Sequence, residues 1–132
     1  MLGTPNLDQP LSVVLLDGHS AVRRAMAAAF DRDEAFRLIG QTGDPAEALR
    51  LCAERLPRIA LADLRRFGNA LDICSSILQA SPATALIVYG SFFQPDEEYR
   101  YLSAGAAACL LKGQTYREIA RKLILLAGGE SG

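Results

Sequence analysis

The feature that most constrains the fold is a regular alternation of short apolar runs with amphipathic segments along almost the whole chain. Each apolar run is rich in Val, Ile, Leu and Ala and ends at a polar or glycine-containing turn, as a buried strand does. The amphipathic segments carry apolar residues at helical spacing. We expect strands at 12–16, 36–41, 58–62, 85–89 and 107–111, and helices at 20–30, 44–56, 69–78, 95–104 and 115–126. This alternation predicts an α/β fold, a parallel sheet with helices on both faces.

Length and charge limit what such a fold could be used for. The chain has 132 residues, enough for one domain, and its net charge is −1. No global attraction to nucleic acid or to an anionic membrane follows from that charge. No apolar run approaches membrane-spanning length. We expect a disordered leader over 1–10, the folded domain over 11–129 and a polar tail over 130–132.

The cysteines indicate a reduced compartment. Cys52, Cys74 and Cys109 are far apart, odd in number and without a CxxC pair, and His19 is the only histidine. A zinc site or a disulfide framework is therefore improbable, and three free thiols in or near the core are expected. These features predict a soluble, cytoplasmic protein.

Polar residues follow four of the predicted strands at the point where each strand ends. Asp17 follows the first, Asp63 the third, Gly90-Ser91 the fourth and Lys112 the fifth. In open parallel sheets, ligands bind at the carboxyl ends of the strands. Taken singly, each is more often a solvated loop residue, but their joint placement favours a site. Two carboxylates suit a hard cation such as Mg²⁺, and a lysine beside them suits a phosphoryl oxygen.

The sequence resembles the receiver domains of bacterial two-component response regulators, and most of all those of the subfamily with a NarL/LuxR-type helix-turn-helix. The matching segments are VVLLDGHSAVRRAM, IALADLRRFG, IVYGSF and AGAAACLLK. The resemblance implies a flavodoxin-like sheet with strand order 2-1-3-4-5 and five helices. The sequence does not favour an enzyme of similar topology, because the GxGxxG, P-loop and GxSxG motifs are all missing.

The resemblance also assigns roles to single residues. Asp63 matches the phosphoacceptor, Asp17 matches one of the acids that hold Mg²⁺, and Lys112 matches the lysine that contacts the phosphoryl group. The backbone carbonyl of Arg65 matches the main-chain metal ligand. The implied partners are a histidine kinase or a phosphotransfer protein, and a second copy of the chain. The implied chemistry is no more than self-phosphotransfer and autodephosphorylation, so the chain is not expected to be an enzyme.

Three positions of the site depart from the family pattern. Gly18 stands where a second acid is usual, which predicts weak Mg²⁺ binding or none. Gly90 stands where Thr or Ser is usual, and Ser91 could replace that hydroxyl only if the loop turned it inward. Cys109 stands at the aromatic switch position. A further hypothesis is that one of the two arginines after Asp63 fills the vacant metal position.

Three functional interpretations stay open. The first is an atypical receiver that accepts a phosphoryl group at Asp63 weakly or not at all and acts through protein–protein contacts or dimerisation. The second is a fully competent Mg²⁺-dependent phosphoacceptor. The third is a stand-alone interaction module, with a candidate patch at Tyr99, Tyr101 and Leu102 or on the helix from Tyr116. DNA binding is not expected inside this chain, so transcription would be regulated through a DNA-binding domain outside it.

Overall fold

The computed structural model describes residues 9–128. Most of the predicted leader, and the whole of the predicted tail, lie outside these residues. Within them, no helix is both long and apolar enough to cross a membrane.

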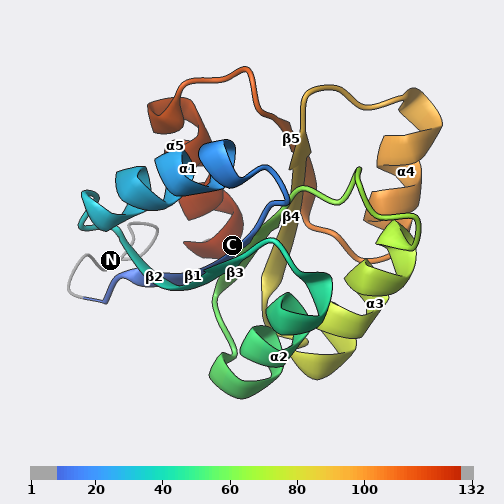
Figure 1. The fold of residues 1–132 in the computed structure, drawn as a ribbon, viewed down its shortest axis with the longest axis horizontal. Helices are drawn as coiled ribbons and strands as arrows, with labels where there is room; N and C mark the ends of the chain where they lie inside the picture. The colour runs from blue at the N-terminus through green and yellow to red at the C-terminus, as the bar shows by residue number, and fades with distance from the viewer. Residues whose placement is uncertain (1–8, 129–132) are drawn as a thin grey trace.

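Five parallel strands form one sheet in the order β2-β1-β3-β4-β5, which confirms the predicted fold class. Figure 1 shows the sheet at the centre of the domain with helices on either side. The strands are β1 (Leu11–Leu16), β2 (Phe36–Thr42), β3 (Ile59–Ala62), β4 (Ala85–Gly90) and β5 (Ala108–Leu111). Each lies within one residue of its predicted bounds.

The helices divide between the two faces of the sheet because successive strand residues point in opposite directions. Buried residues of α1 and α5 pack with Val13 and Leu15 of β1, whereas those of α2, α3 and α4 pack with Val14 and Leu16. The helices are α1 (Ser20–Asp31), α2 (Pro45–Arg55), α3 (Ala70–Ala80), α4 (Pro95–Ser103) and α5 (Tyr116–Gly128). The core is thus two apolar layers separated by the sheet.

Helix starts follow from short polar signals in the sequence. The Asp44 side chain accepts a hydrogen bond of 3.0 Å from the backbone N–H of Ala46, and caps α2 as predicted. Thr115 and Glu118 cap each other's backbone at the start of α5. The residue before α1 is His19, one position earlier than the predicted cap at Ser20.

The sheet ladder continues one residue past three strands, and this positions the predicted site. The backbone N–H of Asp17 donates to the Thr42 carbonyl, that of Asp63 to the Leu16 carbonyl, and that of Lys112 to the Gly90 carbonyl. These bonds measure 3.0, 2.9 and 2.8 Å. The three predicted side chains therefore start from backbone that is held by the sheet itself.

Candidate functional site

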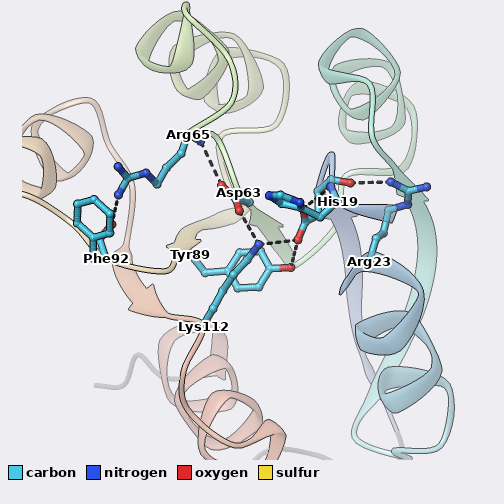
Figure 2. Close-up of polar contacts among 8 residues, drawn as sticks. His19, Arg23, Asp63, Arg65, Tyr89, Phe92 and Lys112 are labelled. Atoms are coloured by element: carbon cyan, nitrogen blue, oxygen red, sulfur yellow. Dashed lines mark hydrogen bonds and ion pairs between the residues drawn. The ribbon is translucent and has the colours of Figure 1, made fainter. Parts of the chain in front are cut away.

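A lysine joins two carboxylates at the carboxyl edge of the sheet. Lys112 Nζ lies 2.9 Å from Asp17 Oδ2 and 2.5 Å from Asp63 Oδ2. Figure 2 shows this side chain reaching across the strand ends, with Tyr89 beneath it. The structure thus brings together the three side chains that the sequence placed at separate strand ends. We call Asp17, Asp63, Lys112 and Tyr89 the carboxylate cluster.

Asp17 is fully buried and every oxygen of its side chain has a partner. Oδ1 accepts from the backbone N–H of His19 at 2.9 Å, and Oδ2 accepts from the Tyr89 hydroxyl at 2.8 Å as well as from Lys112. Its carbonyl accepts from Arg23 Nη1 at 2.6 Å. The histidine contributes through its backbone and stands at the head of α1, in the loop role expected for it.

Tyr89 was not among the predicted site residues. It is the last residue of β4 before Gly90, it is fully buried, and its hydroxyl reaches Asp17. The signal that could have found it is chemical: a tyrosine at the end of a buried strand needs a hydrogen-bond partner for its hydroxyl. Its ring also lies under the ammonium group of Lys112, 4.8 Å from the ring centre.

The carboxylate cluster shifts the pKa values of its own members. Burial alone would lower the pKa of Lys112, but the hydrogen bonds to Asp63 and Asp17 outweigh it, so that pKa is raised. Burial, followed by the negative charge of Asp17, raises the pKa of Tyr89 far above its usual range. At neutral pH the lysine is therefore charged and the tyrosine is a neutral donor.

The Asp63 side of the site is built differently. Asp63 Oδ1 accepts from the backbone N–H of Arg65 at 3.1 Å, and the buried Leu64 between them anchors the loop in the core. The guanidinium of Arg65 turns away from Asp63 and donates to the Phe92 carbonyl (Figure 2). The side chain of Asp63 is 8% exposed, so this is the carboxylate that an incoming group can reach.

The donor set of the site suits Mg²⁺ in kind and falls short in number. The carboxylates of Asp17 and Asp63 offer oxygen ligands, the kind that Mg²⁺ prefers. Within residues 9–128, no three His, Cys, Asp or Glu side chains gather as a metal cluster. A Cβ on Gly18 would lie 3.3 Å from Arg66 Cδ, so an arginine side chain runs beside the missing acid's position. The carboxylates are therefore of the kind that Mg²⁺ binds, with Arg66 beside the position of the missing acid.

The structure also places the positions that depart from the family pattern. Gly90 is buried at the end of β4, and Ser91 is exposed and is not a partner of either carboxylate. Cys109 on β5 is half-buried, and burial raises its pKa to about 11. All three cysteines are free thiols.

One residue of the predicted interaction patch is corrected. Tyr101 is 4% exposed and packs edge-on against Phe93, so it belongs to the core and offers no surface to a partner. Tyr99 and Leu102 are exposed, as the patch required.

Comparison with characterised proteins gives the site a context. No family model matches the chain. It is 31% identical over 121 residues to the transcriptional regulatory protein LiaR of Bacillus subtilis, covering 91% of this chain and 57% of that protein. It is 26% identical over 122 residues to the DNA-binding transcriptional activator DevR/DosR of Mycobacterium tuberculosis, covering 92% of this chain and 56% of that protein. The chain thus spans just over half the length of these relatives.

Solved structures agree in fold. The signal receiver domain of the putative response regulator NarL from Mycobacterium tuberculosis superposes with a TM-score of 0.85 at 28% identity, over 92% of this chain and 99% of that one. A LuxR-family two-component response regulator from Aurantimonas superposes with a TM-score of 0.81 at 22% identity, over 94% of this chain and 90% of that one. Both cover all but a small part of residues 9–128.

Proposed function

Since the chain belongs to the receiver domains of LuxR-family two-component response regulators, we propose that it is an atypical receiver that accepts a phosphoryl group slowly at Asp63. The donor is a histidine kinase or a phosphotransfer protein. The observation that carries the proposal is the carboxylate cluster, in which the accessible Asp63 shares the ammonium group of Lys112 with the buried Asp17.

The proposed step needs only a nucleophile and charge neutralisation. A carboxylate oxygen of Asp63 bonds to phosphorus while the bond from phosphorus to the donor's histidine nitrogen breaks, and that nitrogen keeps the electron pair. Lys112 then pairs with a phosphoryl oxygen and keeps its contact with Asp17. Attack of water on phosphorus later restores the Asp63 carboxylate and releases inorganic phosphate. When bound to Asp17, Asp63 and the Arg65 carbonyl, Mg²⁺ would supply further neutralisation of the phosphoryl charge.

Slowness follows from how Asp17 is occupied. Its two side-chain oxygens already hold the His19 N–H, the Tyr89 hydroxyl and Lys112, and Gly18 supplies no second acid. A metal ion that binds Asp17 must therefore compete with these protein donors for the carboxylate oxygens. We expect phosphorylation to need more Mg²⁺ than a receiver with the full set of acids.

The first test is intact-protein mass spectrometry after incubation with a small phosphodonor over a wide range of Mg²⁺ concentrations. The expected result is a gain of one phosphoryl group in the wild type and none in Asp63→Asn. A wild type that stays unmodified with both the small donor and a panel of histidine kinases would overturn the proposal. The chain would then be a pseudo-receiver that acts through its surface alone.

The second test restores the missing acid. Gly18→Asp should lower the Mg²⁺ concentration for half-maximal phosphorylation by about tenfold, because one more carboxylate joins the ligands. A Cβ at this position would meet only the side chain of Arg66 within 4 Å. Gly18→Asn is the matched control of equal shape without the charge, and should leave the Mg²⁺ requirement close to that of the wild type. Equal values for the Asp and Asn variants would contradict this account of the site.

The output of the receiver is proposed to be a protein–protein contact. The relatives are regulators of transcription, so the signal would pass to a DNA-binding domain outside this chain, in the cytoplasm. Exposed apolar residues that a second copy could cover are Tyr99, Leu102 and Leu111 on α4 and β5, and Leu125 on α5. Sedimentation with and without phosphodonor distinguishes a phosphorylation-dependent dimer from a constitutive one, and a monomer under both conditions excludes a dimer.

A further inference from the structure

Arg65 connects the phosphoacceptor to a second element of the fold. Its backbone N–H holds Asp63 Oδ1, while its guanidinium lies 4.0 Å above the Phe92 ring and donates to the Phe92 carbonyl. Nη1 also lies 3.8 Å from Glu97 Oε1 on α4. Figure 2 shows the side chain leaving the β3–α3 loop and ending against Phe92, on the side away from Lys112.

Glu97 ties this contact to the start of α4. The same Oε1 accepts from the backbone N–H of Gln94 at 3.1 Å and forms part of the box that caps the helix. The arginine therefore holds the β4–α4 loop at Phe92 and the first turn of α4 at Glu97. We call the contacts of Arg65 with Phe92 and Glu97 the arginine latch.

The Arg65 side chain lies against position 90, where receivers of this family usually carry the hydroxyl of Thr or Ser. A Cβ on Gly90 would lie 3.1 Å from Arg65 Cδ and 3.5 Å from Phe93 Cζ. A Thr or Ser side chain at this position would press on the arginine in its present conformation. The absence of a side chain at Gly90 thus leaves the space that the Arg65 side chain needs in this conformation.

The contacts of the latch are weak enough to exchange. The side chains of Arg65 and Glu97 are 29% and 23% exposed, and a partly exposed ion pair at this distance contributes little. A phosphoryl group on Asp63 would bring nearly two negative charges and three acceptor oxygens to the neighbouring side chain. Arginine pairs with such a group through two parallel charge-assisted hydrogen bonds, whereas in the latch it has one hydrogen bond to a neutral carbonyl, one ring contact and one ion pair at 3.8 Å.

We propose that Arg65 is the residue that responds to phosphorylation, in place of the absent hydroxyl at position 90 and the absent ring at position 109. Its guanidinium leaves Phe92 and Glu97 for the phosphoryl oxygens, and this frees the β4–α4 loop and the first turn of α4. Differential binding of one side chain in the two states supplies the conformational preference that a switch requires. The inference rests on the proposed phosphorylation of Asp63.

Hydrogen exchange of the segment 92–100 tests the inference, with the phosphorylated fraction of every sample read by intact mass. In the wild type, phosphorylation should speed exchange of this segment by about threefold, the loss expected for a weak ion pair and a stacked ring. Arg65→Ala should exchange at the faster rate already without phosphodonor, and phosphorylation should not change it further. Arg66→Ala, its neighbour outside the latch, should behave as the wild type.

Further results test the switch and separate it from the phosphorylation on which it rests. Gly90→Thr displaces the arginine and supplies the hydroxyl, so its segment 92–100 should exchange fast without phosphodonor. A phosphorylated wild type with unchanged exchange at 92–100, or an Arg65→Ala variant that keeps the phosphorylation-dependent change, overturns the latch and leaves the phosphoacceptor proposal standing. A wild type that takes no phosphoryl group overturns both.

Discussion

The two sides of the site are held in opposite ways. On the Asp17 side, a carboxylate with no exposed surface has two donors on one oxygen and a third on the other. On the Arg65 side, an arginine side chain that is 29% exposed contacts a ring, a carbonyl and a carboxylate 3.8 Å away. Asp63 lies between the two sides. It shares Lys112 with Asp17, and it accepts a hydrogen bond from the backbone N–H of Arg65.

This difference teaches which side can respond to a signal. A buried charge without partners costs several kcal/mol, so the Asp17 side has one low-energy arrangement. Partly exposed contacts are worth ~1 kcal/mol or less, and water can replace them, so the arginine has alternatives. The Asp17 side therefore acts as the fixed support, and the Arg65 side as the part that can move.

The largest expected effect of a single substitution on the contrast between the two sides is at Lys112. Lys112→Met should lower the free energy of unfolding by about 3 kcal/mol, because it leaves two neighbouring carboxylates without their shared cation. Urea unfolding at neutral pH measures the loss. Lys122→Met is the matched control, since this second lysine is exposed and bonds only to Gln114 among the described residues. Equal losses for the two variants would mean that the carboxylate cluster adds nothing to stability.

Tyr89→Phe removes one donor and keeps the ring. Asp17 Oδ2 then retains Lys112 but loses the tyrosine hydroxyl, and the free energy of unfolding should fall by ~1–2 kcal/mol. The measurement is again denaturant unfolding at neutral pH. An unchanged midpoint would show that the hydroxyl is not needed to hold Asp17.

The same variant gives a pH dependence with a definite sign. The pKa of Tyr89 is raised in the folded protein, so its contribution is full below the pKa of an unfolded tyrosine, about 10, and falls as the pH rises beyond it. The advantage of the wild type over Tyr89→Phe should therefore be constant from pH 7 to 9 and shrink above pH 10. The three cysteines and Lys112 also have raised pKa values, so their contributions to stability fall with rising pH in the same way. Both proteins contain these groups, so their contributions cancel when the two free energies of unfolding are subtracted. An advantage that grows above pH 10 would contradict the assigned role.

Much of this site was predictable, for a physical reason. Parallel strands bring their carboxyl ends to one edge, so the first polar residues after the strands had to meet, as Asp17, Asp63 and Lys112 do. The strand bounds were equally accessible, since a buried run has sharp polar limits. What the sequence pattern does not carry is the direction of a long or amphipathic side chain. Tyr89 turned inward to an acid, and Arg65 turned outward to an aromatic ring.

The error at Tyr101 has a different cause, because helix geometry already argued against the predicted patch. Residues two apart on a helix point to opposite faces, so Tyr99 and Tyr101 could not both be exposed, and Tyr101 packs against Phe93 on the buried face of α4. What the periodicity does not give is the partner, Phe93, which lies in the preceding loop eight residues earlier.

The smallest expected loss of stability is at Arg65, on the more exposed side of the site. Arg65→Ala should change the free energy of unfolding by only about 0.5 kcal/mol, because its ion pair and its stacked ring are both partly exposed. Arg50→Ala on α2, which removes an exposed pair with Glu54 at 3.1 Å, provides the reference value for an ion pair outside the segment 92–100. The two variants should unfold at nearly the same urea concentration and yet differ in hydrogen exchange at the β4–α4 loop. A loss at Arg65 as large as that at Lys112 would make the arginine a second fixed support, and a residue that costs so much to release could not serve as the moving part.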